Sequence, residues 1–172
     1  KRKVFPCYFG SALKIQGVEE FLRGIETFTR ECAYPEEFGA RVFKIARDAQ
    51  GNRLTYLKIT GGSLKVKMLL SNEKEAGEGK EELWEEKAEQ IRIYSGNSFE
   101  AVKEAKAGSV CAVTGLSHTY CGQGLGIEAH TFLPVLEPVL TYKIELPEDC
   151  NVHSMLIKLK ELEEEEPQLH IV

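Results

Sequence analysis

Two stretches of the chain, near its start and near its end, repeat apolar residues every three or four positions. The first set is Val18, Phe21, Leu22, Ile25 and Phe28, and the second is Val152, Met155, Leu156, Leu159 and Leu162. This period matches one face of an α-helix, so each stretch is predicted to form an amphipathic helix. Asp149 is the expected N-cap of the second helix, and Pro167 is expected to end it.

Between the two helices the period of the apolar positions falls to two. Such alternation predicts strands at residues 41–47, 54–60, 64–70, 90–94, 109–114 and 129–135, joined by turns that mostly contain glycine. The polar residues 71–82 are expected to form a mobile connection. Short strands without a long helix between them are typical of a closed or nearly closed antiparallel barrel, because closure removes exposed edges.

Strand-like patterns also occur beside the helices, at residues 4–8, 139–146 and 169–172. They predict a βα piece before the barrel and the start of a β-α-β unit after it, and neither piece makes a finished sheet. Together with a start that lacks Met, this predicts a piece of a longer protein. The apolar face of at least one terminal helix is therefore expected to fray or to be buried in an intermolecular contact, with the oligomeric state left open.

A Gly-Ser-Ala turn joins the first predicted strand to the first helix. It comprises Gly10, Ser11 and Ala12 and is followed by Leu13. A strand that leads through such a turn into a helix presents bare backbone N–H groups, which α/β proteins use to hold anionic or oxygen-rich ligands. An ordinary strand-to-helix turn has the same pattern, so this signal is weak by itself.

The composition is that of a globular protein. The 172 residues are 42% apolar and 28% charged, and the uninterrupted apolar runs are short, such as Met68-Leu69-Leu70. No run approaches the length of a membrane span, and the basic N-terminus lacks the apolar core of a signal peptide. We therefore expect a cytoplasmic protein that does not enter a membrane.

The number and spacing of the cysteines indicate that they are reduced thiols. Their number is odd, at 5, and their spacing is irregular, which argues against a disulfide framework. Cys111, His118 and Cys121 could approach one another across a hairpin, but they contain no Cys-x-x-Cys pair and supply three ligands rather than four. Structural cysteines and a loop histidine are the favoured interpretation, and no metal site is predicted.

Charge is unevenly distributed along the chain. The net charge is −5, with acidic clusters at residues 73–89 and 161–166 and a basic stretch at residues 41–67. A net acidic chain argues against DNA and other nonspecific nucleic-acid binding, but it allows one basic face. Alternation places Lys58, Lys65 and Lys67 together on the outer face of the barrel, where they either contact phosphates or are simply solvated.

Five stretches, taken in order, resemble the large translational GTPases of the elongation factor G class. Within that class they are similar to the ribosomal protection proteins that confer tetracycline resistance. The stretches are FGSAL at 9–13, VFKI at 42–45, RLTYLKITGGSLK at 53–65, AKAGSVCAVTGL at 105–116 and LEEEEPQLHIV at 162–172. The resemblance covers essentially the whole chain.

This resemblance implies three domains: the end of a GTPase domain at residues 1–35, the second-domain β-barrel at 36–133, and the incomplete start of a ferredoxin-like third domain at 134–172. It implies that Gly10, Ser11, Ala12 and Leu13 read the guanine base, with their backbone N–H groups facing O6. It also implies that the full-length protein binds GTP, magnesium and the ribosome, with the barrel touching small-subunit RNA.

Several motifs of such a GTPase are absent from the sequence. There is no G-x-x-x-x-G-K-[ST] phosphate loop and no Asn-Lys-x-Asp sequence, so this chain alone is expected neither to bind GTP usefully nor to hydrolyse it. Residues 48–51, DAQG, match the Asp-x-x-G form, but their place between two strands favours a hairpin turn. Residues 122–125, GQGL, depart from the Gly-Asp-Thr-Leu that the family usually has there.

The cellular role of the parent protein stays open between tetracycline protection, translocation and the recycling of termination factors. A different class of interpretation is a free-standing β-barrel module that binds protein or single-stranded nucleic acid. Against this second interpretation, the sequence pattern predicts few aromatic residues at outward positions.

Overall fold

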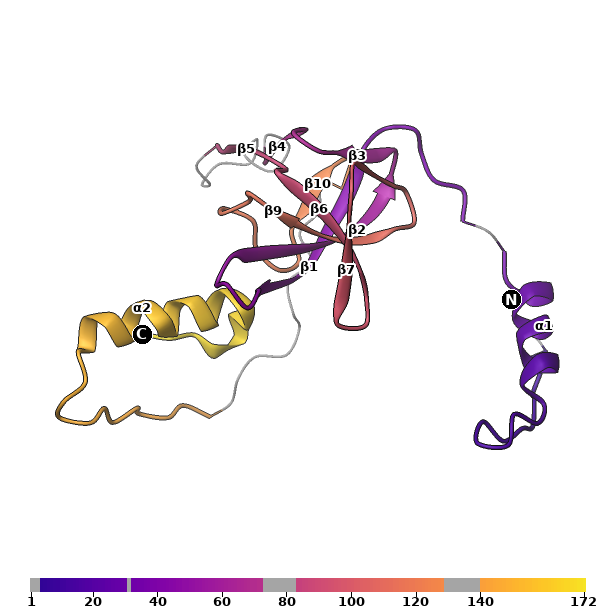
Figure 1. Ribbon diagram of the computed structural model, residues 1–172, viewed down its shortest axis with the longest axis horizontal. Coiled ribbons are helices and arrows are strands. Elements are labelled where there is room, and N and C mark those ends of the chain that lie inside the picture. Colours follow the sequence, from indigo (N-terminus) through magenta and orange to yellow (C-terminus); the bar gives the residue numbers. More distant parts are fainter. Residues whose placement is uncertain (1–3, 31, 73–82, 129–139) are drawn as a thin grey trace. The chain divides into compact units, whose positions relative to one another are not determined.

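The computed structural model describes residues 4–30, 32–72, 83–128 and 140–172, and the chain divides into two compact units, 1–33 and 34–172. Figure 1 shows the elements of both units. Within the described residues, no helix has the length and apolar character needed to cross a membrane.

The first unit consists of a tight loop and helix α1, Val18–Phe28. The helix confirms the predicted period, but the predicted strand at residues 4–8 is wrong, because these residues pair with no described strand. Instead, the ring of Tyr8 lies against the backbone of Gly24 and contacts the ring of Phe21, with the two ring centroids 5.9 Å apart. The segment before α1 thus packs against this helix through Tyr8 instead of joining a sheet.

The core of the second unit is antiparallel. Its strands are β1 (Gly39–Arg47), β2 (Arg53–Gly61), β3 (Ser63–Lys65), β4 (Leu69–Ser71), β5 (Glu85–Lys87), β6 (Gln90–Ser95), β7 (Ser98–Val102), β8 (Glu104–Lys106), β9 (Val110–Thr114) and β10 (Gly124–Gly126). Six of them form one sheet in the order β10-β1-β2-β9-β6-β7, while β3 pairs with β8 and β4 with β5. The mainly β, antiparallel class predicted from the sequence is confirmed.

The core lies on the face of the sheet where the alternating apolar residues meet. Leu57, Ile59 and Ile91 are fully buried there, together with Leu64 from the small β3–β8 ladder. Burying such side chains is worth about 1.5–3 kcal/mol each relative to leaving them exposed, so this alternation explains why the strands form where the sequence places them.

Closure of a barrel is not observed among the described residues. The outer strands β10 and β7 of the large sheet are not paired with each other there. The predicted strand at residues 64–70 is divided into β3 and β4, because Lys67 adopts a left-handed backbone with φ of 65°. The strand expected at 129–135 and most of the polar connection at 71–82 lie outside the described residues.

The C-terminal region contains helix α2, Val152–Glu165, which contacts β1. The helix and its end before Pro167 are confirmed. The expected cap Asp149 is wrong: Asn151 is the N-cap, and its side chain accepts a hydrogen bond from the Ser154 N–H at 3.0 Å.

The strands predicted on either side of α2 are also wrong. Residues 140–146 are not paired with any described strand, and Pro167–Leu169 forms a 3-10 turn instead of leading into a strand. An extended segment becomes a strand only where a neighbour supplies its hydrogen bonds, and the described residues offer none here.

Candidate functional site

The Gly-Ser-Ala turn is a closed loop in front of α1. The Ser11 N–H donates to the Gln16 carbonyl at 2.9 Å, and the Gln16 N–H donates back to the Ser11 carbonyl at 3.2 Å. These two bonds close the loop and leave the amides of Ala12 and Leu13 without a hydrogen-bond acceptor among the described residues. The Leu13 side chain is 95% exposed. The loop therefore has two neighbouring N–H donors that no described acceptor pairs.

Two glycines allow this loop to close. A Cβ on Gly10 would lie 2.6 Å from the Gln16 carbonyl oxygen, and one on Gly17 would lie 2.5 Å from the Phe9 carbonyl oxygen. Gly17 also has a left-handed backbone with φ of 71°. The sequence pattern located this turn correctly, although no strand leads into it.

The three lysines proposed from the alternation occupy different elements. Lys58 lies in β2, Lys65 ends β3, and Lys67 lies in the left-handed turn that follows. The Lys58 ammonium donates to the Gly108 carbonyl oxygen, whereas Lys65 and Lys67 are exposed. No contact between the three lysines is found within the described residues.

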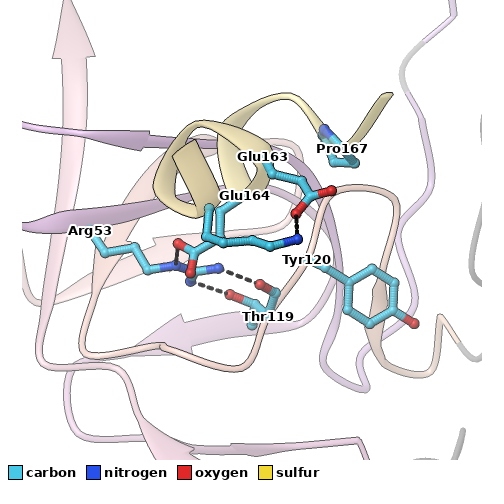
Figure 2. A pocket seen from close by; sticks show the side chains of 7 residues that line it. Arg53, Thr119, Tyr120, Glu163, Glu164 and Pro167 are labelled. Atoms are coloured by element: carbon cyan, nitrogen blue, oxygen red, sulfur yellow. Dashed lines mark hydrogen bonds and ion pairs between the residues drawn. The ribbon is translucent and has the colours of Figure 1, made fainter. Parts of the chain in front are cut away.

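A network around Arg53 was not foreseen from the sequence (Figure 2). Its guanidinium donates to the hydroxyl of Thr119 at 3.0 Å and to the carboxylate of Glu164 in α2 at 3.1 Å. It also donates to the carbonyl oxygen of Leu116 at 2.6 Å. The Thr119 hydroxyl also shares a 2.9 Å hydrogen bond with the buried Thr55 hydroxyl. Arg53 therefore connects β2, the loop after β9, and α2.

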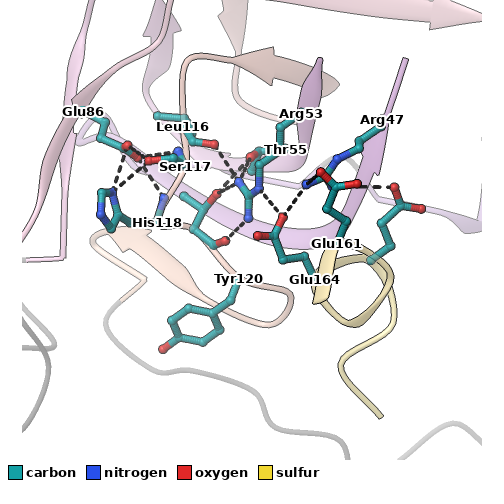
Figure 3. Close-up of polar contacts among 12 residues, drawn as sticks. Arg47, Arg53, Thr55, Glu86, Leu116, Ser117, His118, Tyr120, Glu161 and Glu164 are labelled. Carbon is teal, nitrogen blue, oxygen red and sulfur yellow. Dashed lines mark hydrogen bonds and ion pairs between the residues drawn. The ribbon is translucent and has the colours of Figure 1, made fainter. Parts of the chain in front are cut away.

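Beside this network lies a hollow of about 300 Å³ (Figure 2). It is lined by Arg53, Thr119, Tyr120, Lys160, Glu163, Glu164 and Pro167. Arg47 adds a 3.1 Å ion pair to Glu164 (Figure 3). The two arginines oppose the acidic end of α2, so the charges of this hollow are already paired within the chain.

The residues weighed for a metal do not assemble into a site. Cys111 is buried in β9, and burial raises the pKa of its thiol to about 11, which keeps it protonated. His118 stacks on Trp84, with the ring centroids 6.2 Å apart, and Cys121 donates to the Phe43 carbonyl oxygen. In the part of the chain that the structure describes, no group of three or more metal-ligating side chains is found.

His118 belongs instead to a hydrogen-bonded loop around Glu86 (Figure 3). The Glu86 carboxylate accepts from the Ser117 N–H at 2.7 Å, from the Ser117 hydroxyl, and from the His118 N–H at 3.1 Å. Partial burial raises the pKa of Glu86, but these hydrogen bonds outweigh burial and hold it below its ordinary value. The arrangement fixes the loop and offers no free nucleophile.

Residues 48–51 form the hairpin turn that the sequence favoured. Asp48 Oδ1 accepts from the Gln50 N–H at 3.0 Å and from the Asn52 N–H at 2.9 Å, and the other carboxylate oxygen pairs with Arg92 at 3.1 Å. Because the carboxylate is occupied in this way, the match to Asp-x-x-G is accidental.

Comparison with known proteins places this sheet in a class of translation-factor domains. Residues 37–125, more than half of the chain, match the family model of elongation factor G domain 2, and the chain belongs to this family.

Similarity extends beyond that domain. The chain is 29% identical over 194 residues to elongation factor G 2 of Syntrophus aciditrophicus (strain SB), covering 98% of this chain and 28% of that protein. It is 28% identical over 195 residues to elongation factor G 1 of Bdellovibrio bacteriovorus (strain ATCC 15356 / DSM 50701 / NCIMB 9529 / HD100), covering 98% of this chain and 27% of that protein. The chain thus spans a little over a quarter of these relatives. The resemblance to the elongation factor G class is confirmed.

Proposed function

We propose that this chain is part of a ribosome-binding translational GTPase and that its sheet domain contacts the RNA of the small ribosomal subunit. The observation that carries the proposal is the match of residues 37–125 to elongation factor G domain 2, within a similarity to elongation factor G proteins that covers 98% of the chain. In this proposal residues 1–35 end the GTPase domain, 36–133 are the second domain and 134–172 begin the third. The parent protein acts in the cytoplasm.

The turn at Gly10–Leu13 reads the guanine base in the full-length protein. Its support is the pair of amides on Ala12 and Leu13 that have no acceptor among the described residues. Guanine presents the acceptor O6 at this edge, whereas adenine presents an amino group that would leave both amides unpaired. GTP phosphates and magnesium bind to other parts of the parent, because the present sequence has no phosphate loop.

Lys58, Lys65 and Lys67 supply positive charge to the ribosome-facing side. Lys65 and Lys67 are exposed and free to reach phosphates, while Lys58 keeps its ammonium at the Gly108 carbonyl until RNA displaces it. Phosphate contacts release counterions, so each lost contact lowers the salt dependence of binding by roughly one unit of slope.

The experiment measures binding of the full-length parent to ribosomes at several salt concentrations. Replacing all three lysines by Gln should weaken binding and flatten its salt dependence, while replacing all three by Arg should preserve both. Lys143→Gln, at an exposed position outside the sheet, is the matched control. An unchanged slope in the triple Gln variant would assign the lysines to solvation and contradict this part of the proposal.

Within the family, we assign the parent to ribosomal protection against tetracycline. The five sequence stretches that resemble those proteins support this narrower proposal. Expression of the parent in a tetracycline-sensitive bacterium should raise the inhibitory concentration of the drug. If it instead replaces a depleted elongation factor G and gives no resistance, the parent is a translocation factor.

A further inference from the structure

Four aromatic rings form a continuous row across the large sheet. Phe43, Tyr56, Tyr94 and Phe99, here called the aromatic row, come from β1, β2, β6 and β7. Neighbouring ring centroids are 6.1, 5.8 and 5.4 Å apart along the row. These spacings are those of rings in direct contact.

The register of the strands explains why these rings meet. The pairing of β1 with β2 shifts between Val42 and Lys44, which inserts Phe43 as a bulge residue beside Tyr56. Strand β9 separates β2 from β6, but it presents only the small Ala112 opposite Tyr56, so the Tyr94 ring reaches across it. Tyr94 and Phe99 are direct cross-strand partners.

The row lies on the face of the sheet opposite the core and remains accessible. Tyr56 alternates in β2 with Thr55 and Leu57, both of which are fully buried. The outer rings Phe43 and Phe99 are 45% and 46% exposed. Core packing does not account for these rings, and of the two at the ends of the row Phe99 is covered in part by the Arg92 guanidinium.

Positive charge accompanies the rings. Lys44 Nζ lies 5.9 Å from the centre of the Tyr56 ring, and the Arg92 guanidinium lies 4.4 Å from the centre of the Phe99 ring. Arg92 is paired with Asp48, but Lys44 and Lys58 have no carboxylate partner among the described residues. Because Tyr56 and Lys58 are two positions apart in β2, their side chains share this face.

We propose that the aromatic row is a stacking surface for single-stranded nucleic acid. Bases present flat π-faces of any sequence to the rings. The backbone phosphates need cations that no carboxylate already neutralises, which Lys44 and Lys58 provide once Lys58 leaves the Gly108 carbonyl. An apolar peptide would use the rings but leave these two cations without an anionic partner. The structure thus reverses the expectation that outward aromatic residues are sparse. This inference goes beyond the proposed function and does not depend on it, because it requires neither GTP nor the ribosome.

The test is fluorescence anisotropy of the 172-residue chain with a labelled single-stranded RNA of about 12 nucleotides, a length within the site size of one small β-barrel. Phe43→Ala and Phe99→Ala should each weaken binding about fivefold or more, the loss expected for one stacked base. Tyr142→Ala, an 80% exposed aromatic outside the sheet, is the control and should bind like the unchanged chain. Circular dichroism checks the fold, and Phe43→Leu removes the ring while keeping apolar volume.

The duplex of the same sequence should bind more weakly than the single strand, because its bases cannot reach the rings. Equal binding of duplex and single strand would overturn the proposal in favour of phosphate contacts alone. No binding of the single strand, or unchanged affinity in the folded Phe43→Leu and Phe99→Ala variants, would also overturn it. Binding of an acidic aromatic peptide, but not of the RNA, would assign the row to a protein partner.

Discussion

At the scale of single residues, the amides of Ala12 and Leu13 carry the proposed base recognition. The carbonyl groups of Ser11 and Gln16 accept hydrogen bonds from each other's N–H groups, and no described acceptor pairs with the two amides. These amides therefore remain available to a ligand. Their specificity comes from the cost of an unpaired donor, about 1–3 kcal/mol when it is desolvated. No side chain participates in this recognition, so substitution of side chains is a poor test of it.

Changing the nucleotide tests this recognition more directly. The full-length parent should bind guanosine diphosphate, which has O6, much better than 2-aminopurine riboside diphosphate, which keeps the 2-amino group of guanine but lacks O6. A difference of about tenfold follows from one net hydrogen bond of roughly 1.4 kcal/mol. Competition against a fluorescent guanine nucleotide measures both affinities. Equal affinities would show that the turn does not contact the base edge.

Ionisation of Asp48 stabilises the turn between β1 and β2. Burial raises its pKa, but hydrogen bonds from Asn52, Arg92 and Gln50 outweigh this effect and lower the pKa from 3.8 to about 2. Because the folded value is the lower one, the charged carboxylate stabilises the fold at pH values above 3.8. This stabilisation is lost as the pH falls through about 2.

Asp48→Asn should therefore be less stable than the unchanged chain at neutral pH. The difference should persist down to about pH 4, shrink below that and disappear as the pH falls through about 2, since both side chains become neutral there. Urea unfolding followed by circular dichroism at successive pH values measures it. Glu100→Gln, at an exposed position in β7, is the control. A difference that stays constant with pH would refute the ionic account of the turn.

At the scale of elements, Arg53 joins three segments that are distant in sequence. Its guanidinium satisfies the carbonyl oxygens of Leu116 and Thr119 and reaches Glu164 in α2 (Figure 3). The bonds to the loop are largely buried, whereas the Glu164 carboxylate is 44% exposed. The loop bonds should thus contribute more to stability than the ion pair does.

Arg53→Met should destabilise the second unit by about 1–3 kcal/mol, because two carbonyl groups lose their donor. Glu164→Gln should cost less than about 1 kcal/mol, as is usual for exposed ion pairs. The free energies of unfolding in urea compare the two variants. A larger loss in Glu164→Gln would show that the contact with α2, rather than the loop, dominates the role of Arg53.

The sequence predicted elements well where a pattern was long. The alternation in β1, β2, β6 and β9 identified those strands, because several buried residues fix one face. The three-residue strands β5, β8 and β10 escaped prediction, since Glu85–Lys87 and its counterparts contain too few apolar positions to show a period. The strands predicted at 4–8 and 139–146 failed for a different reason. Their pattern is apolar, but no described strand pairs with residues 4–8 or 140–146.

The candidate sites were likewise predictable only where the signal in the sequence is local. The turn at residues 10–13 was predictable, because glycine, serine and the following helix are local signals. The Arg53 network was not, since its partners lie 63, 66 and 111 residues away and no local pattern marks them. The aromatic row depends on a bulge at Phe43 and on the small Ala112 between two tyrosines, and simple alternation predicts neither.

At the scale of the whole molecule, the two units differ in how much of their apolar surface is buried. The second unit has a buried core around Leu57 and Ile91. In the first unit, Phe21 and Phe28 of α1 are 47% and 64% exposed, and Gly24 is the one buried residue of this helix. Exposed apolar surface costs about 25 cal/mol per Å², so α1 lacks the burial that stabilises the sheet.

Hydrogen exchange should reveal this difference. Amides of β1, β2 and β9 should exchange slowly, because opening them requires disrupting the core, while amides of α1 should exchange fast in a dilute sample. Protection of α1 that rises with concentration would show that copies of the chain cover its apolar face. Equal protection of α1 and the sheet at every concentration would contradict the expectation that the first unit is less stable than the second.

Crosslinking tests the central claim, that the sheet domain contacts small-subunit RNA, most directly. A photoreactive amino acid replaces the exposed Lys65 in the full-length parent, which is bound to ribosomes with a nonhydrolysable GTP analogue. The same amino acid at Gln50, which is exposed in the β1–β2 turn, maps a second point of the domain. We predict a crosslink from position 65 to RNA of the small subunit. Efficient ribosome binding with crosslinks from position 65 only to the large subunit, or to no RNA at all, would contradict the account.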